Sequence, residues 1–315
     1  MVRGLGGDSV TLTYRIDGGA SPFGFGYWSR YAICPRSATL DDMARQAGAE
    51  GEEPGDGLYV GICAHAYLDL HYSGQLDCAL DEVELLPTPP DDIRNEAIRV
   101  ATAHIAAFPA DAVGRTLATE LSFPADYATE GEQAERVARD LGVAPFTGRS
   151  DRVMELATQD EVDALIGLRP ELVGIEPGRY VIDYKFLKQK NKNFRGEYQS
   201  GLRYPAYIMA HNAAYPDLAV NGLIVDCTFK YKTEVKFESV LVRAPDETTQ
   251  QAVREFLVAC RLFRDSMPTF ANAHEHNCFP LTRDPCRWFT QGVCDRTTFT
   301  APEVVRIGES HVGEE

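Results

Sequence analysis

Two short segments that combine apolar strand residues with acidic side chains constrain this chain most. Residues 180–186 read YVIDYKF, and residues 147–153 read TGRSDRV. Each has the composition of a short β-strand, and a glycine bounds each of them. We therefore expect Asp151 and Asp183 to lie on two neighbouring strands.

Lys185 follows Asp183 by two residues, so the two side chains point to one face of a strand and Tyr184 points to the other. Carboxylates and an ammonium are costly to bury without a partner, and a hard divalent cation is the usual partner for oxygen ligands. The pattern predicts a metal site with a lysine beside it. The alternative is a simple ion pair on a solvated face, since buried ionisable groups indicate function only statistically. The apolar neighbours Val181 and Ile182 favour the metal site.

Length and hydropathy limit the class of protein. The 315 residues are enough for one elaborated domain or two, and a hydrophobic content of 44% supports a sizeable core. We find no run of about 18 apolar residues that would span a membrane. The first residues lack the apolar segment of a signal peptide. We expect a cytoplasmic protein.

The net charge of -16 argues against nucleic acid as a partner, because phosphate contacts need Lys or Arg. Local charge matters more than the sum. A basic run follows the Asp183 strand, and a second cluster lies further along. The run comprises Lys185, Lys188, Lys190, Lys192 and Arg195, and the cluster comprises Lys230, Lys232 and Lys236. The alternative is that these are solvated side chains on a loop and a hairpin.

The eight cysteines of a cytosolic chain are expected to be thiols and not disulfides. Four lie in apolar segments and are expected in the core: Cys63, Cys78, Cys227 and Cys260. The other four are Cys34, which precedes a proline, and Cys278, Cys286 and Cys294, which recur every eight residues. Four thiolates can hold an iron-sulfur cluster or zinc, and free thiols are the remaining alternative.

Hydrophobic periodicity predicts a mixed α/β core. We expect helices over 58–72 with His65, over 91–108 with an apolar stripe, over the second half of 193–212, and over 246–267 capped by Asp246. The stripe of the second helix comprises Ile93, Ala97, Ile98, Ala101 and Ile105. Strands are expected over 116–123 with Glu120, around Asp151, around Asp183, and as a pair over 220–227 and 235–242.

The ordered series of a helical His, an Asp strand, an Asp-x-Lys strand and a later helix with Gln and Tyr resembles the PD-(D/E)XK nuclease superfamily, in particular its RecB-like branch. The resemblance covers about residues 29–294. It implies a restriction-endonuclease-like core, which is a mixed central sheet flanked by helices. It further implies an N-terminal helical region over 1–112, the nuclease core over 113–270, and a cysteine-bearing segment over 271–315 that packs back on the N-terminal region.

The resemblance also implies roles for single residues. Asp151, Asp183, the Tyr184 backbone carbonyl and His65 would hold Mg²⁺ or Mn²⁺, with imidazole favouring Mn²⁺ somewhat. Lys185 would be the catalytic lysine.

Two motif positions have open alternatives. Glu120 stands where many members carry a Glu. Gln199 resembles the Gln of a Gln-x-x-x-Tyr helix, but Arg203 occupies the Tyr position and Tyr204 comes one residue late. A second frame runs from Arg203 to Tyr207 with the correct spacing.

Several members of the branch, including CRISPR-associated nucleases, carry a [4Fe-4S] cluster on one N-terminal and three C-terminal cysteines. The resemblance extends this role to Cys34, Cys278, Cys286 and Cys294, although the close C-x-x-C pair of the family is missing. Lys188, Lys190, Lys192 and Arg195 would contact nucleic acid.

Together these features predict a metal-dependent DNA nuclease. We expect an exonuclease that hydrolyses single-stranded DNA or DNA ends in recombination, repair or phage DNA metabolism. The alternative is a catalytically silent DNA-binding module that docks a helicase or recombination protein. The survival of every acidic, lysine and histidine position favours the enzyme.

Overall fold

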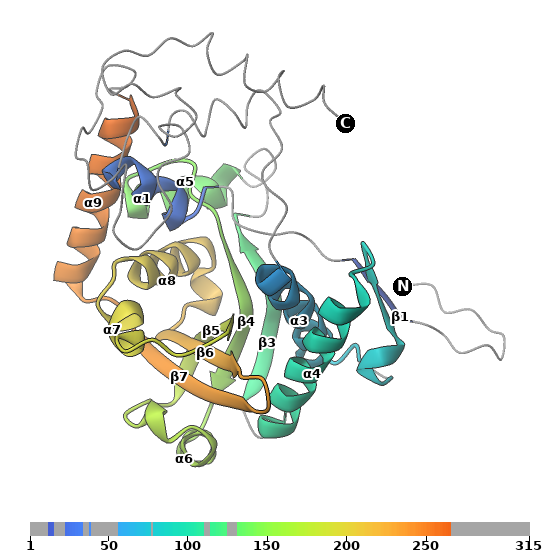
Figure 1. The fold of residues 1–315 in the computed structure, drawn as a ribbon. Helices are drawn as coiled ribbons and strands as arrows, with labels where there is room; N and C mark the ends of the chain where they lie inside the picture. The colour runs from blue at the N-terminus through green and yellow to red at the C-terminus, as the bar shows by residue number, and fades with distance from the viewer. Residues whose placement is uncertain are drawn as a thin grey trace, which may run out of the picture.

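A five-stranded mixed sheet forms the centre of the fold (Figure 1). The computed structural model describes residues 12–15, 23–33, 38, 56–76, 78–109, 114–124 and 131–265. The sheet order is β3-β4-β5-β6-β7, in which β5 and β6 are parallel and all other neighbours are antiparallel. The strands are β3 (Arg115–Phe123), β4 (Gly148–Leu156), β5 (Gly178–Leu187), β6 (Gly222–Lys230) and β7 (Val235–Arg243). The predicted strands and the mixed α/β class are confirmed.

Helices cover both faces of this sheet (Figure 1). One face packs against α3 (Asp56–Tyr72) and α4 (Asp91–Ala107). The other packs against α7 (Phe194–Gln199) and α8 (Arg203–Ala214). Beyond α8, a further apolar cluster joins α1 (Phe25–Ile33), α5 (Gly131–Leu141) and α9 (Glu247–Asp265). Smaller elements are α6 (Gln159–Leu168), the parallel pair β1 (Leu12–Arg15) and β2 (Val83–Leu86), and short 3-10 turns over Leu80–Glu82, Pro170–Leu172 and Pro216–Leu218.

The apolar stripe of α4 differs in part from the prediction. Ile93, Ala97 and Ala101 are buried as expected, but Val100 and His104 complete the stripe. Eleven residues at 3.6 per turn return to within about 20° of the starting direction, whereas twelve residues end about 120° away. Position 104 therefore faces the sheet, and the predicted Ile98 and Ile105 lie at its flanks, partly buried.

Residues 193–212, whose second half was predicted to be helical, form two helices. The chain leaves α7 after Gln199 and enters α8 at Arg203, with Gly201 between them. Glycine weakens a helix interior, and Pro205 fits the first turn of α8 because an N–H is not needed there. This break places Gln199 and Arg203 on different helices.

Two helices lie in segments for which no helix was predicted. The acidic segment after β3 contains α5, and the loop between β4 and β5 contains α6. The second had a readable signal, because Thr158 and Glu161 form a reciprocal capping box. The predicted cap of the last helix is present, with the Thr249 amide donating to Asp246 at 2.8 Å.

The N-terminal helical region and the predicted nuclease core share one apolar cluster. Val60 and Leu68 of α3 and Ala97 of α4 belong to the same cluster as Met154 and Ile182 of the sheet. Residues on both sides of position 112 therefore fold onto each other.

The cysteines expected in the core are placed as predicted in three cases. Cys63, Cys227 and Cys260 are buried, and Cys78 is partly buried. The four cysteines assigned to a cluster, Cys34, Cys278, Cys286 and Cys294, lie outside the described residues. No described helix is both long and apolar enough to cross a lipid bilayer.

Candidate active site

A cavity of about 860 Å³ gathers most of the residues that the sequence singled out. It lies between α3, the β3–β4–β5 part of the sheet and the start of α8. The predicted residues that line it are His65, Glu120, Asp151, Asp183, Tyr184, Lys185, Lys188, Arg203, Tyr204 and Tyr207. Segments that are up to about 140 residues apart in the chain thus meet at one place.

His65, Glu120 and Asp151 form the one group of potential metal ligands among the described residues. One ligand atom from each lies within 4.8 Å of the other two. His65 Nδ1 lies 3.4 Å from Asp151 Oδ2, and it is buried without a hydrogen-bond partner. Burial lowers the pKa of His65, an effect that the Asp151 charge opposes only in part. A neutral imidazole facing two carboxylates is a donor set that fits a divalent cation.

The backbone at Glu120 directs this residue toward the group. Glu120 has a φ of 48°, the only positive φ at a non-glycine residue in the described chain. Leu117, Ala118 and Leu121 all pack against one apolar cluster, and the pairing of β3 with β4 shifts register between Thr116 and Ala118. The strand that carries Glu120 therefore departs from regular two-residue alternation. Such strain costs about 1–3 kcal/mol and is typically found at functional sites.

The pairing of β3 with β4 sets Glu120 opposite Asp151. Thr119 pairs with Arg152 and Leu121 pairs with Ser150, so each neighbour of Glu120 is matched to a neighbour of Asp151. Prediction had left the role of Glu120 open. The strand register makes it a member of the ligand group.

Asp151 is fixed by the backbone of the next strand. The Tyr184 amide donates a 2.7 Å hydrogen bond to Asp151 Oδ2. The Tyr184 side chain lies on the opposite face, as predicted, where its ring is 5.3 Å from that of His104. Burial is the main cause that raises the pKa of Asp151, and nearby Asp183 raises it further.

Asp183 is held outside this ligand group. Its Oδ2 lies 2.6 Å from the Lys185 ammonium and accepts a 3.2 Å hydrogen bond from the Tyr204 hydroxyl. Burial alone would lower the pKa of Lys185, but the Asp183 and Asp151 charges outweigh it and the pKa is raised. Asp183 and Lys185 lie on one face of β5, as predicted, and both line the cavity.

The break before α8 separates the two competing helix frames. Gln199 is exposed at the end of α7 and is not among the described residues that line the cavity. Arg203 and Tyr207 do line it, because residues four apart share a helix face. The Arg203 guanidinium carbon lies 5.6 Å from the Tyr204 ring centroid and 5.9 Å from that of Tyr207. Of the two predicted frames, the one from Arg203 to Tyr207 therefore lies at the cavity, and Gln199 lies outside its described lining.

The basic run is only partly directed to the cavity. Lys188 lines it, but Lys190 and Arg195 both form ion pairs with Glu238 of β7, at 2.7 Å for Arg195. Lys192 is exposed and does not belong to the cavity lining of the described chain.

The second basic cluster is divided in the same way. Lys230 lines the cavity, whereas Lys236 pairs with Glu234 at 2.8 Å and Lys232 is exposed. Proximity in the sequence could not predict which lysines line the cavity. That depends on where each strand ends and on which lysines already pair with an acidic side chain.

Arg149 and Tyr14 are among the cavity residues that the sequence analysis did not single out. Arg149 pairs with Glu120 at 2.7 Å, and its position two residues before Asp151 was a readable signal. Tyr14 of β1 donates a 2.6 Å hydrogen bond to Asp69 of α3 and also lines the cavity. Nothing in the local sequence marked Tyr14.

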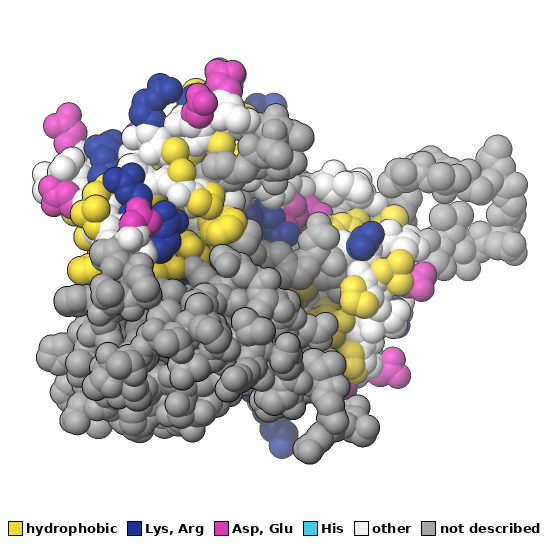
Figure 2. Space-filling model, turned by 90° about the horizontal axis from the view of Figure 1, so that it is seen from above, with side chains coloured by type: hydrophobic (Ala, Val, Ile, Leu, Met, Phe, Trp, Pro, Cys, Tyr) yellow, Lys and Arg dark blue, Asp and Glu magenta, His cyan; other side chains and the backbone are white. Residues whose placement is uncertain are grey.

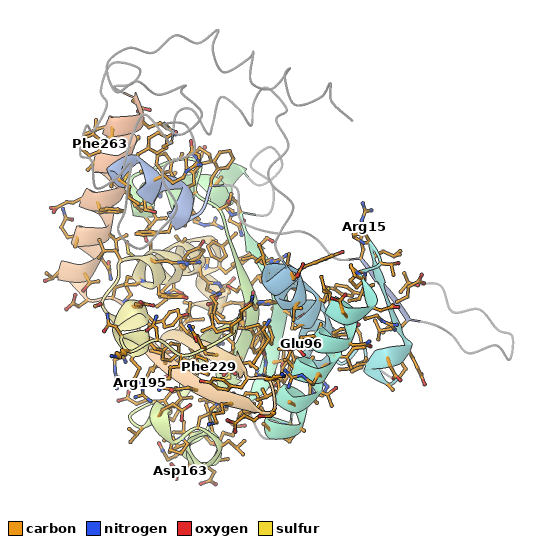
Figure 3. The ribbon with its side chains drawn as sticks, in the orientation of Figure 1. Arg15, Glu96, Asp163, Arg195, Phe229 and Phe263 are labelled. Atoms are coloured by element: carbon orange, nitrogen blue, oxygen red, sulfur yellow. The ribbon has the colours of Figure 1, made fainter. Side chains whose placement is uncertain are left out.

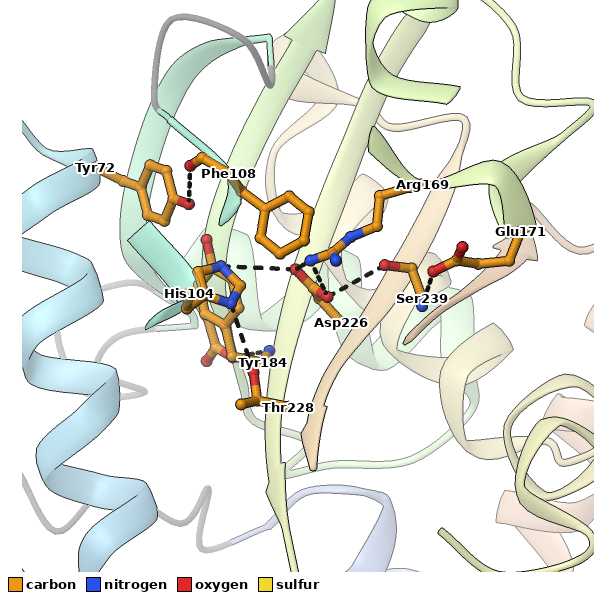
Figure 4. Close-up of polar contacts among 10 residues, drawn as sticks. Tyr72, His104, Phe108, Arg169, Glu171, Tyr184, Asp226, Thr228 and Ser239 are labelled. Atoms are coloured by element: carbon orange, nitrogen blue, oxygen red, sulfur yellow. Dashed lines mark hydrogen bonds and ion pairs between the residues drawn. The ribbon is translucent and has the colours of Figure 1, made fainter. Parts of the chain in front are cut away.

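A second charged group lies across the sheet, on the α4 side, and was also missed (Figure 4). Asp226 of β6 accepts hydrogen bonds from Arg169 at 2.7 and 2.9 Å and from the Ser239 hydroxyl at 3.1 Å. His104 Nε2 lies 3.7 Å from Asp226. The Asp226 carboxylate has cationic and neutral donors on several sides, so this group is a satisfied structural network.

Positive and negative side chains are mixed on the face of the protein that Figure 2 shows. In the view of Figure 2, Lys and Arg side chains are interspersed with Asp and Glu over the described part of that face. The negative net charge is not gathered there into a single acidic patch.

No protein-family model, curated protein or solved structure matches this chain.

Proposed function

We propose that this chain is a metal-dependent nuclease that hydrolyses phosphodiester bonds of DNA, with its sheet serving as a PD-(D/E)XK core. One observation carries the proposal. The His65–Glu120–Asp151 group and the Asp183–Lys185 pair line the same cavity. An acidic ligand group beside an ammonium suits metal-assisted phosphodiester hydrolysis, since a bound cation and the ammonium both neutralise negative charge on the phosphate.

His65, Glu120 and Asp151 would hold Mg²⁺ or Mn²⁺. Their fit rests on the mutual 4.8 Å spacing and on the buried His65 Nδ1 that lacks a hydrogen-bond partner. A cation bound there supplies Lewis-acid activation of water and of the phosphate. The Tyr184 amide keeps the Asp151 carboxylate oriented toward the group.

Lys185 and Arg203 supply positive charge from the chain itself. Asp183 fixes the Lys185 ammonium at 2.6 Å, and Tyr204 fixes Asp183 in turn. This chain of contacts orients the ammonium so that little reorganisation is needed when charge develops on the phosphate. Arg203, whose guanidinium lies near the Tyr204 and Tyr207 rings, can bind a non-bridging phosphate oxygen.

The form of the site favours a single strand or a DNA end over continuous duplex. The cavity is bordered by α3, the sheet and α8, and aromatic side chains such as Tyr27, Tyr204 and Tyr207 line it beside the cations. Aromatic rings and cations in one groove are typical of single-strand binding. We therefore propose exonuclease action.

The experiment is release of nucleotides from end-labelled single-stranded and double-stranded DNA with Mn²⁺ or Mg²⁺. The intact protein is compared with Asp151→Asn and Lys185→Ala, and with Gln199→Ala as a matched substitution outside the cavity. We expect cleavage by the intact protein and by Gln199→Ala, and none by the other two variants. Linear and covalently closed circular substrates then separate exonuclease from endonuclease action.

Unchanged turnover in Asp151→Asn would refute the metal-dependent mechanism. If the intact protein binds DNA and cleaves none of these substrates with either metal, the chain is a silent DNA-binding module, and a helicase or recombination protein becomes the partner to seek.

A further inference from the structure

Lys188 and Lys230 lie next to each other at the carboxyl ends of the two parallel strands. Leu187 of β5 is paired with Phe229 of β6, and the two lysines follow these residues directly. Both line the cavity. The sequence had assigned them to separate basic clusters, and the parallel register brings one lysine from each cluster together.

The two charges have no anionic partner in the described part of the chain. Neither lysine forms an ion pair with a described residue. The charge of Glu96 of α4 raises the pKa of Lys230. Glu96 itself accepts two hydrogen bonds from Arg99, of 2.7 and 2.8 Å. Burial lowers the pKa of Lys230, and Lys188 and Arg99 lower it further against the pull of Glu96. Two ammonium groups held together without a counterion favour an anion between them.

Two cations of the basic run that contains Lys188 do have an acidic partner. Lys190 and Arg195 share Glu238, and Arg195 lies on the outer side of α7, away from α3 (Figure 3). Local sequence alone had grouped Lys188 with Lys190 and Arg195. Among the described lysines and arginines of the two basic clusters, only Lys188 and Lys230 combine a place in the cavity with the absence of an ion pair to a described acid.

We infer that Lys188 and Lys230 form a second phosphate-binding site, which takes one backbone phosphate of a nucleic-acid strand whose scissile phosphate lies at the His65–Glu120–Asp151 group. The inference rests on the proposed function. Lys188 stands three residues beyond Lys185, which corresponds to about 10 Å along an extended strand. A short length of single strand spans this interval. The site therefore selects oligonucleotides over substrates that contain a single phosphodiester.

The first turn of α3 shapes this end of the cavity. A Cβ atom at Gly57 would lie 3.3 Å from Cε of Lys188, so the lysine side chain passes directly over this glycine. Leu58 is 63% exposed and also lines the cavity. It offers an apolar surface to the sugar or base next to the bound phosphate.

The test measures binding and does not depend on cleavage. The affinity of a 3′-fluorescein-labelled oligothymidylate of about 12 nucleotides is measured by anisotropy over a range of salt concentrations in EDTA. The double variant Lys188→Ala/Lys230→Ala is compared with the intact protein and with the control Lys190→Ala/Arg195→Ala. Loss of one phosphate contact reduces the slope of log K against log salt by about 0.7 for a single strand.

We expect this smaller slope and a several-fold higher Kd in Lys188→Ala/Lys230→Ala, and the slope of the intact protein in the control. The charge-conserving Lys188→Arg/Lys230→Arg is expected to restore the slope. An unchanged slope in the alanine pair, or an equal loss in the control, would overturn the inference. If the intact protein binds the oligonucleotide with the expected slope but cleaves no DNA, the proposed function fails while the phosphate site stands.

Discussion

Two residues apart on β5, Asp183 and Lys185 form an ion pair of 2.6 Å. The two predicted acids have different surroundings. Asp151 is one of the three potential metal ligands that lie together, whereas Asp183 contacts the Lys185 ammonium and accepts a hydrogen bond from Tyr204. Under the proposed function, these are two different roles. Metal binding and catalysis should therefore respond differently to substitutions on neighbouring strands.

Replacing Glu120 tests the ligand group. Glu120→Gln keeps the size of the side chain and removes its charge, so we expect Mn²⁺ affinity to fall at least tenfold in isothermal titration calorimetry. The matched control is Glu132→Gln on α5, whose carboxylate is exposed and paired with Arg136. Equal Mn²⁺ affinity in the intact protein and Glu120→Gln would remove Glu120 from the group.

Replacing Lys185 should separate metal binding from turnover. We expect Lys185→Ala to retain Mn²⁺ binding within a few-fold, because its ammonium is a cation and cannot be a ligand. Its cleavage rate should fall by about 10² or more, the usual cost of losing one fixed donor to a developing charge. Single-turnover assays at saturating Mn²⁺ measure this rate. A variant that loses Mn²⁺ binding and cleavage in parallel would contradict the separation.

The motif frame that begins at Gln199 and the one that begins at Arg203 predict opposite effects of substitution on activity. Arg203→Ala removes a cavity cation, and we expect kcat/KM on single-stranded DNA to fall by about 10²-fold. Arg203→Lys should recover part of this loss, since it keeps the charge without the fork of N–H donors. Gln199→Ala, outside the cavity lining, should stay within about twofold of the intact protein. A larger loss of kcat/KM in Gln199→Ala than in Arg203→Ala would support the frame that begins at Gln199 instead.

The buried pair across the sheet predicts a stability effect. Asp226→Asn leaves the guanidinium of Arg169, which is 4% exposed, without its charged partner. Breaking a buried pair in this way costs about 3–5 kcal/mol of unfolding free energy. Urea unfolding measures it, with Glu238→Gln as the control, because its partners Lys190 and Arg195 are exposed and such pairs contribute about 0–1 kcal/mol. A cost below that of the control would show that Arg169 finds other acceptors.

Stability should fall on mild acidification because of two buried histidines. Burial lowers the pKa of His104 and of His211 to about 4, below the ordinary value near 6.5. The unfolded chain therefore binds more protons between about pH 4 and 6.5, and the free energy of unfolding rises with pH across this window. Each histidine contributes up to about 3 kcal/mol at pH 7 that is lost toward pH 4.

The measurement is urea unfolding of the intact protein and of His211→Gln between pH 7 and pH 5. The glutamine amide can replace the imidazole Nε2 donor, which bonds the Leu218 carbonyl at 3.2 Å. We expect a shallower pH dependence in the variant. Identical pH profiles would mean that His211 is not protonated on unfolding in this window.

Local pattern was sufficient for much of the fold and for part of the site. The strands around Asp151 and Asp183, the helix that carries His65 and the hairpin of β6 and β7 follow from periodicities of two and 3.6 residues. The shared face of Asp183 and Lys185 follows from the same alternation. These features depend only on residues close together in the chain.

The sequence by itself therefore determined the five strands of the sheet, the helices that carry His65 and the α4 stripe, and the acids and lysine on the strands. Tertiary structure alone decided which side chains meet. Glu120 joins Asp151 through a break in strand alternation, Lys188 meets Lys230 through a parallel register, and Arg203 replaces Gln199 through a helix break. The physical reason is that backbone strain, strand register and cross-strand ion pairing are settled by the packing of distant segments, which spacing along one segment does not encode.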